Sequence, residues 1–363
     1  MSLIMNNSLL NQLRKICLDL TNKTKFSILI GTLDPENNEV RAYSAIHFPK
    51  DVESHLSSLL PSDDEINQFK SLKFMLPYNL EIIGIAFYTD EEISEFNMKS
   101  LVSKVKDFPA IKFVVNVGQV EILYYQISDA KPLKLEAQAV DLQTNNLLKF
   151  IHTMEFETSD KILTNQMELK KKSFSSIDIL WDKITFNKDK NTDLKSLQAT
   201  KSPLDKIIEI LVPCEDKQLS SKTEEGNVFL AFDLHMNYFV SNALRNKKLH
   251  EVKEQLNTVM KQDLMVKLQR AIFDENIKRL ILPAKIPLKF FGMELNAYLL
   301  RDNPSKFEFD LCSSLIKHAE ISALIGSELQ ARIFLRDLNE YFQILDDKEK
   351  QKEISNLLLK LSN

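Results

Sequence analysis

The feature that most constrains the fold is an apolar run within residues 74–90, FMLPYNLEIIGIAFYTD. A proline-marked turn leads into Leu80–Tyr88, where isoleucines and aromatic residues predict a buried strand. Directly after it, Thr89 and Glu92 have the spacing of a capping box and predict the start of a helix. A buried strand that passes directly into a helix favours a layered structure of mixed α/β type.

The segments around this strand fit the same class. The turn-rich hexapeptide DPENNE joins two short strand-like runs and predicts a hairpin. A helix is expected before the turn, with Ser62 or Asp63 as its N-cap. The predicted hairpin strands are Lys25–Leu33 and Val40–Phe48; later strands are expected in 111–117, 120–127 and 134–142. We therefore predict an α/β (α+β) fold with two mixed-sheet domains, followed by C-terminal helices.

The chain divides by composition into four parts. Residues 1–150 form the first predicted domain. Residues 151–226 form a predicted polar linker with short docking segments. We predict a linker there because the runs 186–202 and 215–226 are poor in aromatic residues. Residues 227–302 predict a second, smaller domain: a strand, a long amphipathic helix and two strands near Pro287 and Gly292. Residues 303–363 predict a helical extension.

Composition narrows the function classes. The net charge of −4 across 363 residues, with a pI of about 6.0, does not predict a nucleic-acid partner. The sequence predicts no signal peptide and no membrane span. Three widely spaced cysteines favour a reducing compartment. The predicted location is the cytoplasm, with the periphery of the endoplasmic reticulum as an alternative.

A metal site at the end of this buried strand is the first chemical hypothesis. Metal-dependent isopeptidases of the MPN/JAMM class place a His-x-His-Pro motif there, so that two imidazoles bind zinc. Aligned on Gly84, the corresponding positions hold Phe87, Thr89 and Asp90. Phenylalanine cannot bind the metal, and Thr89 is better explained as a helix cap. No metal is therefore predicted.

Thiol and histidine chemistry is the second hypothesis. Cys17 lies in an apolar helical pattern, Cys214 lies next to two acidic residues, and Cys312 lies six residues before His318, on another side of a helix. We interpret all three as buried small side chains, although their reactivity stays open. His235 and Asp233 alternate on one predicted strand and should share a face. The sequence thus predicts no catalytic, metal-binding or cofactor-binding residues, and no cofactor.

The segment MLPYNLEIIGIAF resembles the Met-Leu-Pro-Gly-Gly-Leu segment of MPN-like proteins of the ubiquitin-fold-modifier pathway. These are the odorant-response-abnormal-four type adapters and the non-catalytic N-terminal region of the modifier-specific cysteine protease. Residues 233–272 and 279–302 resemble their strand, long helix and proline-flanked strand pair. Tyr78 and Asn79 depart from the pattern, since they replace the paired glycines.

The resemblance implies an MPN-like fold and a partner-binding role, and it supplies no catalytic residue. We therefore expect a non-catalytic adapter, or pseudoenzyme scaffold, that binds a protease or another protein of the pathway. One alternative is a chain related to the modifier-specific thiol protease. Another is an inactive MPN subunit of a lid-type assembly, in which C-terminal helices would bundle with other subunits. The oligomeric state stays open.

Overall fold

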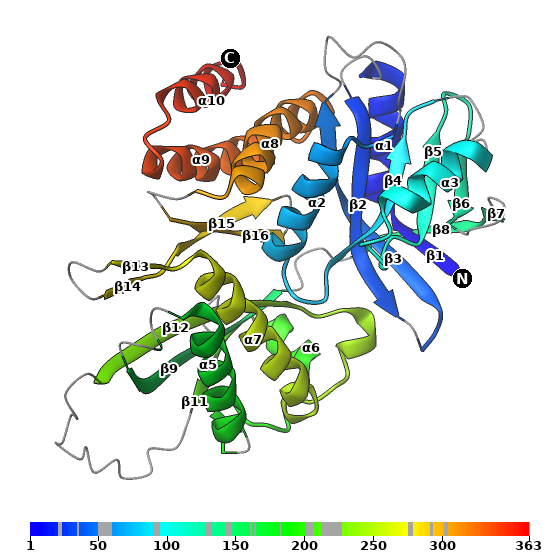
Figure 1. Ribbon diagram of the computed structural model, residues 1–363. Coiled ribbons are helices and arrows are strands. Elements are labelled where there is room, and N and C mark those ends of the chain that lie inside the picture. Colours follow the sequence, from blue (N-terminus) through cyan, green and yellow to red (C-terminus); the bar gives the residue numbers. More distant parts are fainter. Residues whose placement is uncertain are drawn as a thin grey trace.

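The computed structural model describes residues 1–20, 24–34, 36–49, 60–89, 95–127, 133–142, 147–159, 162, 165–181, 183–200, 206–211, 227–274, 279–290, 293–300 and 304–362. These residues form a mixed α+β structure with a large mixed sheet, smaller sheets and C-terminal helices (Figure 1). The predicted fold class is confirmed in these terms.

The large sheet belongs to the N-terminal part of the chain. Its described strands are β1 (Ser2–Asn6), β2 (Thr24–Asp34), β3 (Glu39–Pro49), β4 (Glu81–Phe87), β5 (Phe113–Val117), β6 (Ile122–Gln126), β7 (Leu133–Leu135) and β8 (Ala137–Val140). They lie in the order β7-β6-β5-β4-β2-β3-β1-β8. The predicted hairpin is the antiparallel pair β2–β3, whereas β4 pairs in parallel with β5.

The predicted buried strand is β4, and it is buried on both faces. Ile83 and Ala86 pack toward helix α1 (Asn7–Asp19), while Ile85 and Phe87 pack toward helix α2 (Asp63–Met75). Gly84 faces the ring of Phe113, and a Cβ at this position would lie 2.8 Å from that ring. The glycine therefore lets β4 and β5 approach closely.

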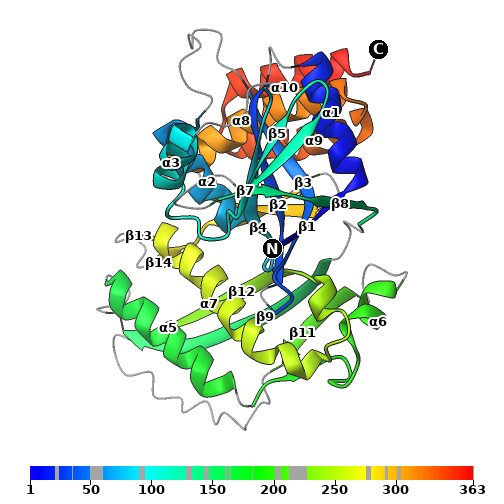
Figure 2. The ribbon, with the colours of Figure 1, turned by 90° about the vertical axis from the view of Figure 1, so that its right-hand side faces the viewer.

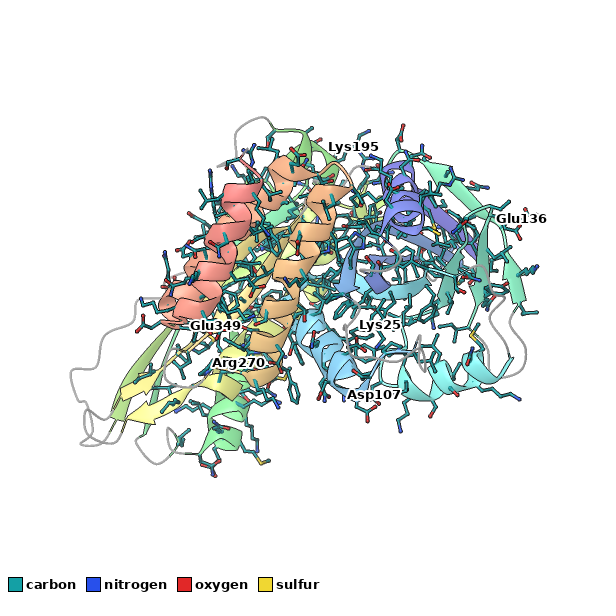
Figure 3. The ribbon with its side chains drawn as sticks, turned by 90° about the horizontal axis from the view of Figure 1, so that it is seen from above. Lys25, Asp107, Glu136, Lys195, Arg270 and Glu349 are labelled. Atoms are coloured by element: carbon teal, nitrogen blue, oxygen red, sulfur yellow. The ribbon has the colours of Figure 1, made fainter. Side chains whose placement is uncertain are left out.

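Helices also cover the face of the large sheet that lies opposite helix α1. Helix α3 (Glu95–Lys104) and the three C-terminal helices α8 (Lys306–Leu324), α9 (Glu328–Ile344) and α10 (Lys348–Lys360) contribute to the same core as α2. Figure 3 shows the C-terminal helices beside the sheet, seen from above. The hairpin β15 (Ala284–Phe290) and β16 (Met293–Leu299) packs into this first core as well.

A second core lies below the first (Figure 2). It comprises the sheet β10-β11-β9-β12 and the helices α5 (Gln166–Trp181), α6 (Leu194–Ala199) and α7 (Lys253–Arg270). The strands are β9 (Leu147–Ser159), β10 (Thr185–Phe186), β11 (Ile207–Leu211) and β12 (Asn227–Phe239), while β13 (Ile272–Asp274) and β14 (Arg279–Ile281) form a separate short ribbon.

One local expectation was wrong. The run 186–202 was expected to bury no core, yet Leu194 and Leu197 of α6 are buried in the second core. The reason is that a short polar helix needs only two apolar side chains on one face to dock. The run 215–226 lies outside the described residues. The four-part division into domains stays a prediction, because packed cores show contacts and not independent folding.

No helix in the described part of the chain is both long enough and apolar enough to cross a membrane.

Candidate functional site: a cleft beside the Met-Leu-Pro turn

The Met-Leu-Pro turn connects α2 to β4. Helix α2 ends at Met75, and Leu76 has an extended backbone with ψ of 143°, as expected of a residue that precedes a proline. Asn79 has a φ of 70°, in the left-handed region that glycine and asparagine adopt most easily. The conformation therefore accounts for asparagine at one of the two positions where the resembling family has glycine.

The turn attaches to the edge of β12. The backbone N–H of Tyr78 donates to the carbonyl of Asn237, and the N–H of Phe239 donates to the carbonyl of Tyr78, both at 2.9 Å. The ring of Tyr78 stacks on Tyr238 with centroids 5.5 Å apart, and Asn79 Nδ2 donates to the carbonyl of Phe239 at 3.2 Å. The sequence segment with the family resemblance thus joins the two cores.

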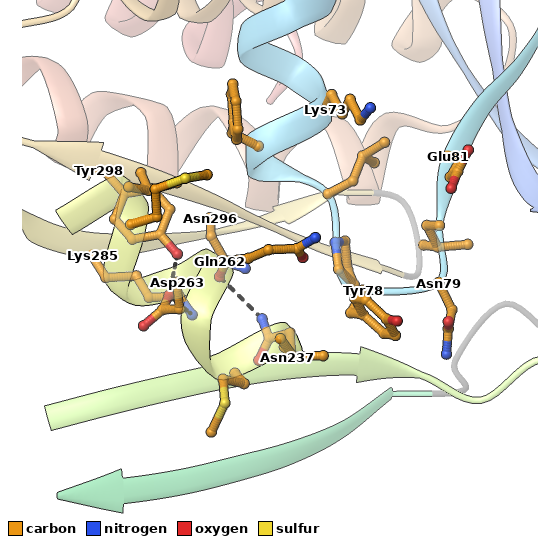
Figure 4. A pocket seen from close by; sticks show the side chains of 18 residues that line it. Lys73, Tyr78, Asn79, Glu81, Asn237, Gln262, Asp263, Lys285, Asn296 and Tyr298 are labelled. Atoms are coloured by element: carbon orange, nitrogen blue, oxygen red, sulfur yellow. Dashed lines mark hydrogen bonds and ion pairs between the residues drawn. The ribbon is translucent and has the colours of Figure 1, made fainter. Parts of the chain in front are cut away.

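A cleft of about 380 Å³ opens beside this turn (Figure 4). Its walls come from α2 and the turn, from β12, from α7 and from the hairpin β15–β16. The polar side chains that line it are Lys73, Asn79, Glu81, Asn237, Gln262, Asp263, Lys285, Asn296 and Tyr298; the apolar ones include Phe74, Leu76, Met236 and Val266. These residues are far apart in the sequence, so only the fold brings them together.

A buried charged group forms one wall. The hydroxyl of Tyr298 donates to Oδ1 of Asp263. Asp263 Oδ2 lies 3.3 Å from Lys267 Nζ, and Asp263 Oδ1 lies 3.7 Å from Lys285 Nζ. Burial lowers the pKa of Lys285, and burial raises the pKa of Tyr298. Tyr298 therefore stays protonated and acts as a hydrogen-bond donor.

A second polar group links β12 to the hairpin. Asn237 Nδ2 donates to Glu294 Oε1 at 2.7 Å and to Asn296 Oδ1 at 3.1 Å. Lys149 Nζ donates to Glu294 Oε2 at 2.9 Å. These contacts cross from the second core to the first, and they place donors and acceptors side by side along the cleft.

A second cleft of about 310 Å³ adjoins the first, and both are lined by Met236, Asn237 and Lys285. Asp233 and His235 both line the second cleft. The carboxylate of Asp233 accepts a hydrogen bond from Thr153 Oγ1 at 2.8 Å. Burial lowers the pKa of His235, with smaller contributions from Lys267 and Lys285. This histidine is therefore neutral at physiological pH.

At the C-terminal end of β4, where the sequence raised the question of a metal site, the side chains pack against other buried residues. Phe87 lies in the first core, with its ring centroid 6.4 Å from that of Phe26. The hydroxyl of the next residue, Tyr88, lies 2.6 Å from Ser27 Oγ. Asp90 and the predicted capping partner Glu92 lie outside the described residues. Within the described ranges, no group of three or more His, Cys, Asp or Glu side chains could hold a metal ion.

The two described cysteines are buried. Cys17 Sγ donates to the carbonyl of Val117 at 3.0 Å. Burial raises the pKa of the Cys312 thiol well above its ordinary value, and nearby Glu308 adds to the effect. A raised thiol pKa lowers the thiolate fraction that would be needed for nucleophilic attack. Cys214 lies outside the described residues.

The fold also forms a histidine pair that the sequence did not predict. The backbone N–H of His47 donates to His318 Nδ1 at 2.9 Å, and the two rings stack with centroids 4.8 Å apart. Ser27 Oγ lies 2.7 Å from His47 Nδ1, and Ser322 Oγ lies 3.2 Å from His318 Nε2. Burial lowers the pKa of His47 to about 3. The pair is a neutral contact between β3 and α8.

The fold and the site thus define a mixed α+β protein with two joined cores and a polar cleft at their junction. No family model matches the chain, and no curated protein matches its sequence. Among solved structures, the chain is similar to the crystal structure of UfSP from C. elegans, with 9% sequence identity and a TM-score of 0.43. The similarity covers 87% of this chain and 56% of the other, so the chain spans little more than half of that structure.

Proposed function

We propose that the chain is a non-catalytic adapter of the ubiquitin-fold-modifier pathway that binds a protein partner, such as a modifier-specific protease, in the cytoplasm. One observation carries the proposal. The Met-Leu-Pro turn, which bears the sequence resemblance, forms the wall of an open cleft at the junction of the two cores. Clefts between packed units, with a few convergent polar groups on an apolar lining, are common binding sites.

The burial of Phe87 and of two cysteines supports a non-catalytic role. Phe87 fills the position at which a related hydrolase would hold a zinc ligand, and its ring is part of the first core. Cys17 and Cys312 are buried, and burial raises the pKa of Cys312. These three side chains stabilise the fold, which leaves surface recognition as the function that the described residues support best.

Purification of the tagged full-length chain from its native cytosol, with crosslinking and mass spectrometry, tests the proposal. We expect a protein partner at a fixed stoichiometry, with crosslinks to the chain. The absence of any stable protein partner would overturn the adapter function. Labelling of Cys214 or Cys312 by a thiol-reactive probe, together with modifier cleavage that is lost on substitution by alanine, would instead support the protease alternative.

A further inference from the structure

Lys285 lies where the two clefts meet. It belongs to strand β15, its side chain is 13% exposed, and it lines both clefts. Its Nζ donates to the carbonyl of His235 on β12, and it lies 3.7 Å from Oδ1 of Asp263 on α7. Figure 4 shows Lys285 beside Asp263 and Tyr298 on one wall of the first cleft. Contacts with two other elements therefore hold this amine in place next to an open space.

One carboxylate serves two lysines in this group. Asp263 is buried, and its Oδ2 lies 3.3 Å from Lys267 Nζ, while Lys285 approaches its Oδ1. Burial and a second ammonium nearby both favour the neutral form of a lysine. Burial accordingly lowers the pKa of Lys285, and Lys267 adds to the effect. When Lys285 gives up its proton, the group of one carboxylate and two lysines becomes electrically neutral.

The other charged groups of the second cleft change this balance little. Glu294 and Lys149 are paired with each other at 2.9 Å, and their effects on the pKa of Lys285 are opposite in sign. The carboxylate of Asp233 accepts a hydrogen bond from a neighbouring threonine, and burial lowers the pKa of His235. The environment of Lys285 thus favours the free amine.

A neutral lysine amine is a nucleophile towards carbonyl groups. It keeps two N–H groups for the His235 carbonyl and for Asp263, and it gains a lone pair in place of the third. The hydroxyl of Tyr298 donates to Asp263 Oδ1, and the centre of its ring lies 5.9 Å from Lys285 Nζ. Burial raises the pKa of Tyr298, so this hydroxyl is a protonated group beside the amine. A proton donor in this place assists the loss of water from an amine–carbonyl adduct.

The first cleft has the size and lining of a small-molecule site. Its volume of about 380 Å³ lies within the range of about 300–1,000 Å³ that is usual for such sites. The amides of Asn237, Gln262 and Asn296 offer hydrogen-bond donors and acceptors, while Phe74 and Leu76 add apolar surface. This lining suits a small carbonyl compound that carries polar substituents.

We propose that Lys285 is a reactive amine that binds a small aldehyde or ketone in the first cleft as an imine. The nitrogen attacks the carbonyl carbon, and a proton moves from nitrogen to oxygen to give a carbinolamine. The C–O bond then breaks, the oxygen leaves as water with both hydrogens of the amine, and a C=N bond remains. The Tyr298 hydroxyl gives a proton to the leaving oxygen and regains one from the nitrogen through Asp263. This site goes beyond the adapter function and does not depend on it.

Reductive trapping on the full-length chain tests the inference. Glycolaldehyde forms the imine, cyanoborohydride reduces it to a stable secondary amine, and peptide mapping by mass spectrometry locates the product. Lys289, exposed on the same hairpin, is the internal control. At about pH 7.5 we expect trapping at Lys285 to be at least about tenfold faster, because more of its amine is neutral at this pH. Equal or slower trapping at Lys285 would overturn the inference.

The pH dependence separates a reactive amine from one that is only accessible. An ordinary lysine amine has a pKa of about 10.4 and gains free base until the solution reaches that pH. The Lys285 amine completes this gain at lower pH, since its pKa is lowered. The ratio of trapping at Lys285 to trapping at Lys289 should therefore fall between about pH 7 and pH 10. A constant ratio would count against a reactive amine.

Tyr298→Phe tests the proton donor. Trapping of the imine at Lys285 should slow at least about tenfold, because the loss of water needs an acid. Acylation of Lys285 by an N-hydroxysuccinimide ester, which does not remove oxygen as water, should keep its wild-type rate. Tyr125→Phe, which removes a buried hydroxyl outside both clefts, should change neither rate. Equal losses of both reactions in Tyr298→Phe, or no loss of trapping, would overturn the part assigned to this hydroxyl.

Discussion

At the scale of single residues, the shape of the cleft depends on the backbone of Asn79. A φ of 70° costs most L-residues about 1–2 kcal/mol, but asparagine adopts it more readily because its short polar side chain can hydrogen-bond locally, here to the carbonyl of Phe239. We expect Asn79→Ala to lower the free energy of unfolding by about 1–2 kcal/mol. Asn79→Gly should cost less, because glycine adopts this conformation freely. Denaturant unfolding curves measure both.

The control for this prediction is Asn356→Ala, on the exposed face of α10. Alanine favours a helix interior more than asparagine does, so this variant should be no less stable than the wild type. Equal losses for Asn79→Ala and Asn79→Gly would show that the side-chain hydrogen bond, and not the backbone conformation, accounts for the effect.

The buried histidine pair predicts a pH dependence of stability. Burial holds the pKa of His47 at about 3 and lowers that of His318 well below its ordinary 6.5. Below about pH 6.5 the unfolded chain binds protons that the folded chain does not, so the free energy of unfolding should fall. This loss should continue until about pH 3, where His47 becomes charged in the folded state.

Unfolding curves across this pH range, for the wild type and His318→Asn, test the contribution of the pair. The asparagine carbonyl can replace Nδ1 as the acceptor for the His47 N–H, but it does not titrate. The slope of stability against pH should therefore be shallower for His318→Asn. Asn356→Ala, which removes no titratable group from an exposed site, should keep the wild-type slope. An unchanged slope in His318→Asn would contradict the assignment.

At the scale of elements, local signals predicted most of the fold. The hairpin β2–β3, strand β4, helix α7 and the C-terminal helices follow from periodicity, turns and caps that lie within each segment. The cleft did not follow from them, because it joins residues between Lys73 and Tyr298. The sequence suggested a site at the C-terminal end of β4, whereas the cleft lies beside the turn that precedes β4.

The same limit applies to the histidine pair. His47 and His318 are 271 residues apart, and each lies on an apolar face where burial alone explains it. No local pattern could bring them together. Only the packing of α8 on β3 does so, which is a property of the whole fold.

The start of α2 offers a test at this scale. Ser62 Oγ accepts from the Glu65 N–H at 3.2 Å, and the Glu65 carboxylate accepts from the Ser62 N–H at 2.6 Å. Ser62→Ala removes the side-chain part of this capping box and should cost about 1 kcal/mol of stability. Ser355→Ala, within α10, removes no cap and should cost nothing measurable. Thermal unfolding of both variants separates capping from a general serine effect.

At the scale of the whole molecule, the two cores meet at the end of β12. Phe239 packs in the first core, with its ring centroid 5.0 Å from that of Tyr43, while its neighbours Tyr238 and Val240 pack in the second. Alternation along one strand thus sends adjacent side chains into different cores. The unfolding of the two cores is therefore coupled at this strand end, because neither core can unfold there without exposing part of the other.

Loss of the Phe239 ring should therefore uncouple the cores. We expect the wild type to unfold in a single calorimetric transition. Phe239→Ala should cost about 3–5 kcal/mol and should unfold in two transitions. Phe150→Ala removes an equal ring from within the second core, against Tyr238, and leaves the joint intact. It should lower the temperature of one undivided transition. A single transition in Phe239→Ala would show that the cores are coupled elsewhere, and the polar links from β12 to the hairpin would be the next contacts to test. Two transitions in Phe150→Ala would show that the splitting is not specific to the Phe239 contact.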